Sequence, residues 1–267
     1  MISGSLLFSV AAMGALLPAA AVRFRAADHR DALFWVVLAL AVVVPTGWAI
    51  ALLGGEWRTS FAVSLWVTVA ATMALFFAVA ALTRSAWRLT PLLVPYLVVL
   101  GLLATIWQHA PAPRLSGEVP LGWLEAHIFF AVATYGLVTV AAIAALAVMI
   151  QERALKAKRP TGLSRRLPAV SEAETIEVRL LAVSEIVLGA GLLSGMAAQY
   201  FTTGALLAFN HKTIFSIAAF IMIGLLVVLY HRTGLRGRRS ARAVLIAYLL
   251  LTLAYPGVKF VAGVLLS

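Results

Sequence analysis

Residues 123–150 read WLEAHIFFAVATYGLVTVAAIAALAVMI, and this stretch decides the fold class. It is long enough to cross a bilayer, because about 20 helical residues span the roughly 30 Å of hydrocarbon. From Ala141 to Ile150 the residues are apolar on every side, whereas strands that span a membrane alternate apolar and polar residues. Lipid offers backbone groups no hydrogen-bond partners, so the segment predicts a membrane-spanning helix and an all-α protein.

Similar apolar stretches recur along the chain of 267 residues, of which 63% are hydrophobic and 12% are charged. About a quarter of the residues in a typical soluble protein are charged. The connections between the stretches are short, so we expect one membrane domain over residues 1–267. Eight spans are expected, at residues 4–22, 32–53, 61–83, 91–107, 123–150, 179–202, 212–231 and 243–265.

The formal net charge of +11 is distributed unevenly over these connections. Most of the Lys and Arg residues lie in the connections that follow the first, third, fifth and seventh spans. The positive-inside rule places these connections in the cytoplasm and both termini outside it. The charge then serves topology and contact with membrane lipid, which argues against a nucleic-acid partner. We expect a multi-pass protein of the bacterial inner membrane.

Three helix boundaries can be predicted from local sequence. The fifth helix continues past the bilayer until Arg159-Pro160 ends it. The pattern Ser171-Glu172-Ala173-Glu174 predicts a capping box at the start of the next helix. Tyr255-Pro256-Gly257 interrupts the last span, where proline can kink a helix.

Three of the five histidines lie at the ends of predicted spans. His127 and His211 begin spans five and seven near the external face, and His231 ends span seven on the cytoplasmic side. Twenty helical residues rise about 30 Å, so His211 and His231 cannot bind one iron. Two facing imidazoles suit haem iron, which predicts a site held by His127 and His211. His29 and His109 lie in connections and are interpreted as solvated residues.

Aromatic and ionisable residues add further candidates. Tryptophans are more frequent toward the external side, as in a membrane-interface belt or around an external aromatic site, and Trp123 is the candidate for contact with a cofactor. Lys259, in the last span, either snorkels to the interface or meets a haem propionate. Glu185 lies inside span six, where a carboxylate needs a partner such as Arg179 or His231.

The absence of cysteine excludes disulfides and thiol redox chemistry by this chain. Any haem is therefore expected to be b-type, held without a covalent link to the protein. No nucleophile, acid-base pair or metal triad converges in the predicted layout, so the protein is not expected to be an enzyme.

Three segments resemble the CcsA-type cytochrome c assembly proteins, which handle haem in membranes, and in particular their short YpjD-like or HemX-like branch. The resemblance is strongest over residues 123–265. It is carried by a span that opens with a histidine and has a tyrosine two turns later, by a span-ending histidine before a basic turn, and by an aromatic-Gly-Val motif in the last span. These segments are Trp123–Gly136, Leu229–Arg239 and Leu253–Phe260.

The resemblance implies a haem-binding protein that takes part in cytochrome c assembly, with other cytochrome assembly proteins as partners. It also implies functional roles for His127 and His231. Full-length members have a Trp-rich WWD motif where this chain reads Phe209-Asn210-His211-Lys212-Thr213, and a second external histidine after the last span, which this chain lacks. By position, His211 takes the place of that second histidine.

Two other functions remain open from the sequence. One is an accessory protein for divalent-cation transport, which would depend on Glu185. The other is a regulatory membrane subunit of a haem-synthesis enzyme, in which the histidines are ordinary interface residues and the basic cytoplasmic face, including Arg165 and Arg166, makes the contacts.

Overall fold

The computed structural model describes residues 2–22, 31–54, 60–108, 121–206 and 210–261. The elements in this part of the chain are all helical, which confirms the all-α fold class. They are α1 (Ile2–Val22), α2 (Ala32–Leu53), α3 (Phe61–Leu82), η1 (Ala86–Leu89), α4 (Thr90–Ile106), α5 (Leu121–Lys156), η2 (Ser164–Arg166), α6 (Val170–Thr203), α7 (His211–Thr233), α8 (Arg238–Thr252), η3 (Leu253–Gly257) and α9 (Val258–Phe260).

Within the described residues, each of the eight predicted spans is found as a helix. In that part of the chain seven helical segments are long and apolar enough to cross a membrane, and α1 is a further apolar helix. As predicted, α5 extends past the apolar stretch to Lys156. The interruption predicted in the last span is η3, a π-helical turn that contains Pro256. Proline lacks the backbone donor that continues the α-helical pattern, so the hydrogen bonds change register there.

Short polar side chains fix where several helices begin. Asp31, Ser60 and Asn210 each accept a hydrogen bond from the backbone N–H three residues later, at 2.9, 3.1 and 2.9 Å. A cap of this kind stabilises a helix by about 1 kcal/mol. The Asn210 cap sets the first turn of α7 and therefore the directions in which His211 and Lys212 leave the helix.

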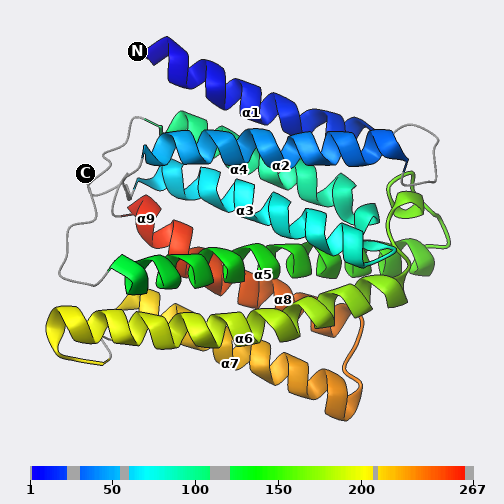
Figure 1. The fold of residues 1–267 in the computed structure, drawn as a ribbon. Coiled ribbons are helices and arrows are strands. Elements are labelled where there is room, and N and C mark those ends of the chain that lie inside the picture. The colour runs from blue at the N-terminus through cyan, green and yellow to red at the C-terminus, as the bar shows by residue number, and fades with distance from the viewer. Residues whose placement is uncertain (1, 23–30, 55–59, 109–120, 207–209, 262–267) are drawn as a thin grey trace.

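Helix α5 lies between two groups of helices (Figure 1). It packs against α3 on one side and against α6 and α8 on the other, and its contact with α6 is the most extensive in the described structure. A glycine permits the approach to α3, because a Cβ atom on Gly136 would lie 2.6 Å from Leu75 Cδ1. Helices α2 and α4 pack against α3, α1 packs against α2 and α4, and α7 packs against α6 and α8.

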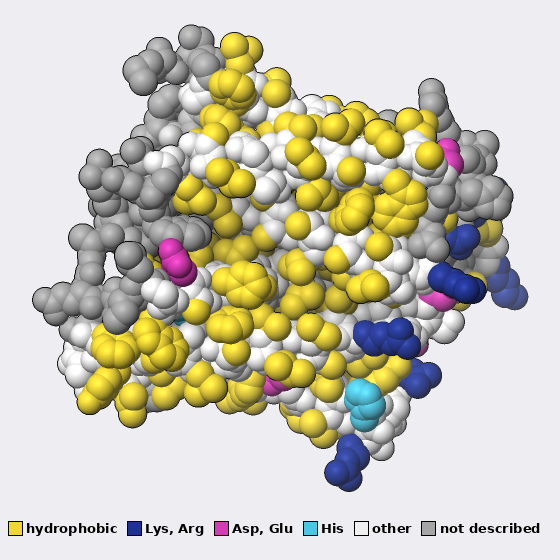
Figure 2. Space-filling model, in the orientation of Figure 1, with side chains coloured by type: hydrophobic (Ala, Val, Ile, Leu, Met, Phe, Trp, Pro, Cys, Tyr) yellow, Lys and Arg dark blue, Asp and Glu magenta, His cyan; other side chains and the backbone are white. Residues whose placement is uncertain are grey.

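Basic side chains gather at one end of the bundle, where α5 ends, α6 begins and α7 connects to α8. Figure 2 shows them in dark blue at the right, beside a belt of yellow apolar side chains. Helix α1 begins, and α9 ends, at the opposite end (Figure 1). That the basic end faces the cytoplasm, with both termini outside, stays a prediction from the positive-inside rule.

The start of α6 differs from the predicted capping box. The sequence predicts that Ser171 caps the helix and that Glu174 closes back on it. In the structure α6 begins at Val170, and Glu172 accepts the hydrogen bond from the Ala169 N–H at 3.2 Å. Glu172 therefore replaces Glu174 as the third residue of the helix. The earlier start leaves Glu174 free to bind another element.

Three carboxylates from α5 and α6 bind the start of α8. The hydrogen bonds are Gly237 N–H to Glu174 at 2.7 Å, Arg238 N–H to Glu152 at 3.1 Å, and the Ser240 hydroxyl to Glu177 at 2.9 Å. Carboxylates stabilise a helix N-terminus, whose first N–H groups have no partner within the helix. Gly237 permits the approach: its φ is +69°, and a Cβ atom there would lie 2.4 Å from a Glu152 carboxylate oxygen.

We expect Glu174→Ala to loosen the start of α8, whereas Glu172→Ala loosens only the start of α6. Losing a hydrogen bond to a charged group costs roughly 1.5 kcal/mol or more, which is about tenfold in an opening equilibrium. Because the chain has no cysteine, a single Ala241→Cys substitution reports on this opening. Ala241 is fully buried in the first turn of α8, so thiol labelling in detergent should accelerate with Glu174→Ala. Equal acceleration by Glu172→Ala would contradict the assignment.

Candidate functional site

The side chain of His127 leaves the second turn of α5 and packs against α6. Its Nδ1 atom lies 3.1 Å from the carbonyl oxygen of Gly191 and 3.1 Å from the hydroxyl of Ser194. Ser194 itself donates to the Gly191 carbonyl at 2.9 Å. The pattern is consistent with a proton on Nδ1 that is donated to α6, which leaves a lone pair on Nε2. A neutral imidazole held in this way is a typical metal ligand.

Gly195 on α6 makes room for this ring, and Gly191 permits close contact with Phe130 of α5. A Cβ atom on Gly195 would lie 2.9 Å from His127 Cε1, and one on Gly191 would lie 3.4 Å from the Cβ atom of Phe130. Small residues permit close helix approach in membranes, as the sequence Ser194-Gly195-Met196 indicates. The His127 ring can therefore occupy this position only because Gly195 has no side chain.

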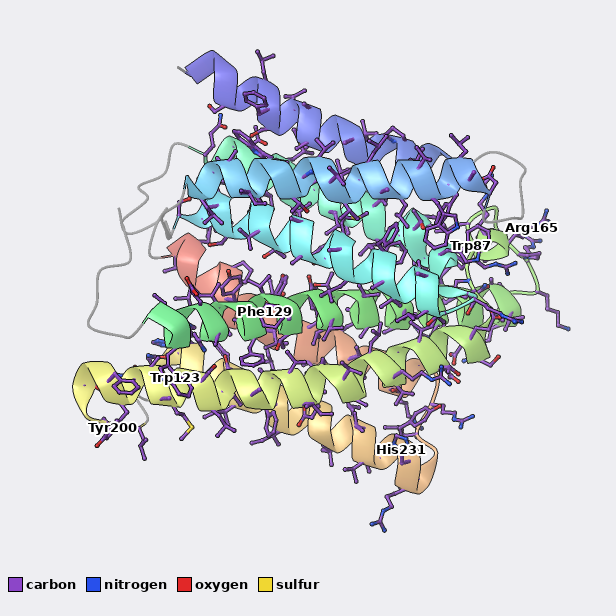
Figure 3. All side chains as sticks on the ribbon, in the orientation of Figure 1. Trp87, Trp123, Phe129, Arg165, Tyr200 and His231 are labelled. Atoms are coloured by element: carbon purple, nitrogen blue, oxygen red, sulfur yellow. The ribbon has the colours of Figure 1, made fainter. Side chains whose placement is uncertain are left out.

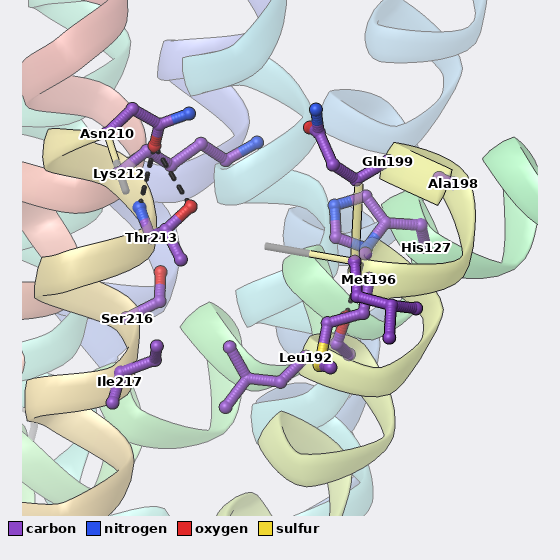
Figure 4. A pocket seen from close by; sticks show the side chains of 13 residues that line it. His127, Leu192, Met196, Ala198, Gln199, Asn210, Lys212, Thr213, Ser216 and Ile217 are labelled. Carbon is purple, nitrogen blue, oxygen red and sulfur yellow. Dashed lines mark hydrogen bonds between the residues drawn. The ribbon is translucent and has the colours of Figure 1, made fainter. Parts of the chain in front are cut away.

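An open cavity of about 380 Å³ lies beside His127, between α6 and α7. Its volume is within the range of roughly 300–1,000 Å³ that is common for small-molecule sites. Apolar side chains line part of it, and polar side chains from both helices line the rest (Figure 4). The apolar residues include Leu192, Met196 and Ile217, and the polar ones include Gln199, Lys212 and Ser216.

A second, smaller cavity of about 70 Å³ extends inward from the first. His127 and Lys212 line both cavities. The inner cavity reaches Tyr135 on α5 and Tyr255 in η3. The site is therefore a cleft that narrows from the end of the bundle toward its interior.

Tyrosine hydroxyls form a hydrogen-bonded cluster behind the inner cavity. The hydroxyl of Tyr135 lies 3.1 Å from that of Tyr248 and 3.2 Å from the hydroxyl of Thr252. Tyr248 also forms a hydrogen bond with Tyr96 on α4. In a membrane interior, polar groups have to find partners within the protein. The cluster therefore joins α4, α5 and α8 behind the site.

A histidine in an apolar cleft, at one end of a helical membrane bundle, agrees with the resemblance in the sequence. A family model described as "Cytochrome C assembly protein" matches residues 32–266, nearly the whole chain. The chain belongs to the cytochrome c assembly protein family.

The chain is similar over its whole length to a bacterial relative. The two are 53% identical over 270 residues, which cover 99% of this chain and 100% of the relative, an "Uncharacterized 28.8 kDa protein in nifR3-like 5'region" of Azospirillum brasilense. No solved structure matches the chain.

The structure of this cytochrome c assembly family member places His127 and His231 at opposite ends of the bundle. Figure 3 shows Trp123, which begins α5 close to His127, at one end, and His231 at the other. His231 is exposed, and its Nδ1 atom lies 2.8 Å from the carbonyl oxygen of Val227, within its own helix. His231 therefore lies too far along α7 to share a ligand with His127.

His211 and Lys212 are neighbours, but Lys212 is the one that faces the cleft. Both side chains are exposed in the first turn of α7, but only Lys212 is among the residues that line the two cavities. Lys212 is one of the few basic residues on the predicted external side, which is the signal that sequence reasoning overlooked. Ligation of a metal by His211 stays a prediction.

The described tryptophans do not line either cavity. Trp123 is 47% exposed at the start of α5, and its contact with a cofactor stays a prediction. Trp66 is buried, and Trp107 packs against Phe61 and Phe260. Trp66 and Trp107 therefore serve helix packing and do not form a wall of the cleft.

Four other candidates have separate outcomes. His29, His109 and the side chain of Lys259 lie outside the described residues. Among the residues that the structure describes, Glu185 forms no ion pair with Arg179 or His231. Its carboxylate lies against α7, because a Cβ atom added to Gly224 would lie 2.7 Å from Oε1 of Glu185. Within the same residues, no three His, Cys, Asp or Glu side chains come together as a metal site.

We expect His127 to carry its proton on Nδ1 in the unliganded protein. Nitrogen NMR of protein labelled at histidine separates the two tautomers, and His127→Gln identifies the signal. Gly195→Ala should shift that signal, because the new Cβ atom overlaps the ring. Gly47→Ala is the matched control, since a Cβ atom there meets nothing within 4 Å. A proton on Nε2, or a signal unchanged in Gly195→Ala, would contradict the geometry.

Proposed function

We propose that this protein binds b-type haem in the cleft beside His127 and acts in haem handling during cytochrome c assembly. Membership of the cytochrome c assembly protein family supports a role in cytochrome c biogenesis. The observation that carries the finer proposal is the His127 ring, whose Nδ1 is held by α6 and whose Nε2 keeps a lone pair beside a cavity. Imidazole nitrogen is a standard axial ligand of haem iron.

The chemistry of the cleft fits a haem group. Apolar walls from Leu192, Met196 and Ile217 suit the edge of a porphyrin, and polar side chains at the α7 side suit its carboxylates. The cavity is open, so a flat macrocycle need not be enclosed within it. The chain has no cysteine for a thioether link, which is consistent with non-covalent binding.

Other parts of the proposal rest on topology and family. We place the protein in the bacterial inner membrane, with the cleft at its external face and membrane lipid around the apolar belt. Other cytochrome assembly proteins are the proposed partners, and haem is carried by the protein and is not changed chemically. His127 is the proposed iron ligand, and His211, which lies at the same end of the bundle, is proposed as the second one.

Haem titration of the purified protein tests the role of His127. We expect a Soret band that saturates with the wild-type protein, and His127→Ala should weaken binding by at least about tenfold, or roughly 1.4 kcal/mol. His231→Ala is the matched control, because this exposed histidine lies at the other end of the bundle. It should leave the titration unchanged.

Thermal melting in detergent and size-exclusion profiles show that each histidine variant is folded. No Soret band with the wild-type protein, or a band unchanged in His127→Ala, would contradict the proposed function. Equal loss of binding in both histidine variants would show that the loss is not specific to a site at His127.

The spin state of the bound iron tests His211. Two imidazoles give a low-spin, six-coordinate site, so His211→Ala should retain a Soret band and shift the absorption and magnetic circular dichroism spectra toward five-coordinate, high-spin iron. Exogenous imidazole should restore the low-spin spectrum. If His211→Ala has the wild-type spectrum, the second ligand is another residue, and binding through His127 still stands.

A further inference from the structure

Lys212 is placed where it can reach a ligand in the cleft. It lies in the first turn of α7, next to the Asn210 cap, and lines both the outer and the inner cavity. Figure 4 shows its side chain directed from α7 toward the side of the cavity where His127 and Gln199 lie.

No carboxylate neutralises this lysine among the residues that the structure describes. The ion pair within that part of the chain joins Lys156 to Glu152, on the basic end of the bundle. None of the other polar residues that line the outer cavity with Lys212 is a carboxylate. They are His127 on α5, Gln199 on α6, and Asn210, Thr213 and Ser216 at the start of α7. The Lys212 side chain is also exposed, so its charge is open to an anion that enters the cleft.

The start of α7 strengthens the preference for an anion. The N-terminus of a helix carries a partial positive charge, which adds to that of Lys212 in the same turn. The apolar side chains Leu192, Met196 and Ile217 line the cavity further along the two helices. The cleft therefore combines a cationic side, an imidazole and an apolar wall, which matches an amphipathic ligand with carboxylate groups.

We propose that Lys212 binds a propionate carboxylate of the haem whose iron is bound by His127. This inference rests on the proposed function and assigns Lys212 to the charged end of the same site. A lysine ammonium and a carboxylate form a charge-assisted hydrogen bond, which is stronger than a bond between neutral groups. The cleft then distinguishes haem from porphyrins whose carboxylates are masked, and it sets the direction in which haem lies.

The test compares haem with haem dimethyl ester, in which both propionates are methylated. The full-length protein in detergent is titrated with each compound, and the Soret band gives the dissociation constants. Lys212→Met should weaken haem binding by roughly tenfold, the size of a charge-assisted hydrogen bond, and leave binding of the diester unchanged. Lys212→Arg keeps the charge and should retain most of the affinity for haem.

Lys156→Met is the matched control, because this lysine is exposed and lies at the other end of the bundle. It should change neither titration. Added salt should weaken haem binding by the wild-type protein more than by Lys212→Met, since salt screens the pair. Binding of the diester by Lys212→Met shows that this variant is folded.

Three results would overturn the assignment. If Lys212→Met weakens haem and diester equally, the lysine supports the cleft and not the propionate, and haem binding still stands. If Lys259→Met, and not Lys212→Met, weakens haem alone, Lys259 holds the carboxylate. If the wild-type protein binds neither compound, the proposed function fails together with this inference.

Discussion

The site depends on the close packing of α5 against α6 at His127. Gly195 leaves room for the imidazole ring, Gly191 lets α6 approach Phe130 of α5, and the Gly191 carbonyl with Ser194 holds Nδ1. Because one nitrogen is bound to α6, the other is the one that remains available to a ligand. The same approach of the two helices sets where α6 faces α7, and so where the cavity opens. A bulkier residue at Gly195 changes the ring, its hydrogen bond and the cavity wall together.

Polar groups inside the bundle are organised around helix contacts. The hydroxyls of Tyr135, Tyr248 and Tyr96 bind one another across α5, α8 and α4. In lipid these hydroxyls have no water as an alternative partner, so their pairing favours one alignment of the helices. Tyr135 also borders the inner cavity. The floor of the cleft is therefore made of groups that hold the fold, which limits how far the site can change shape without loosening the bundle.

The sequence predicts the spans well because apolar length and alternating charge report directly on the membrane. It also selects His127 as a candidate, since a histidine at the start of a span is visible in the pattern; the structure places this residue beside the cleft, and its binding of iron stays a prediction. The sequence does not show whether His211 or Lys212 faces the cleft. Consecutive residues leave a helix about 100° apart, so the start of α7 at the Asn210 cap decides which one faces the cleft. Glu172 and Glu174 show the same limit: a shift of two residues in the start of α6 exchanges their roles.

The two ends of the bundle use charge in different ways. At the basic end, Glu152, Glu174 and Glu177 each accept a hydrogen bond from the start of α8. At the other end, Lys212 faces a cavity without a carboxylate partner among the described residues. Charged or polar groups that have no partner within the protein are expected at functional sites. Helix α8 connects the two ends, because it begins at the carboxylates and continues through Tyr248 into η3, which borders the inner cavity. The carboxylates that fix the start of α8 therefore also fix the depth at which Tyr255 of η3 meets the inner cavity, so an anchor at the basic end of the bundle helps to position the cleft at the other end.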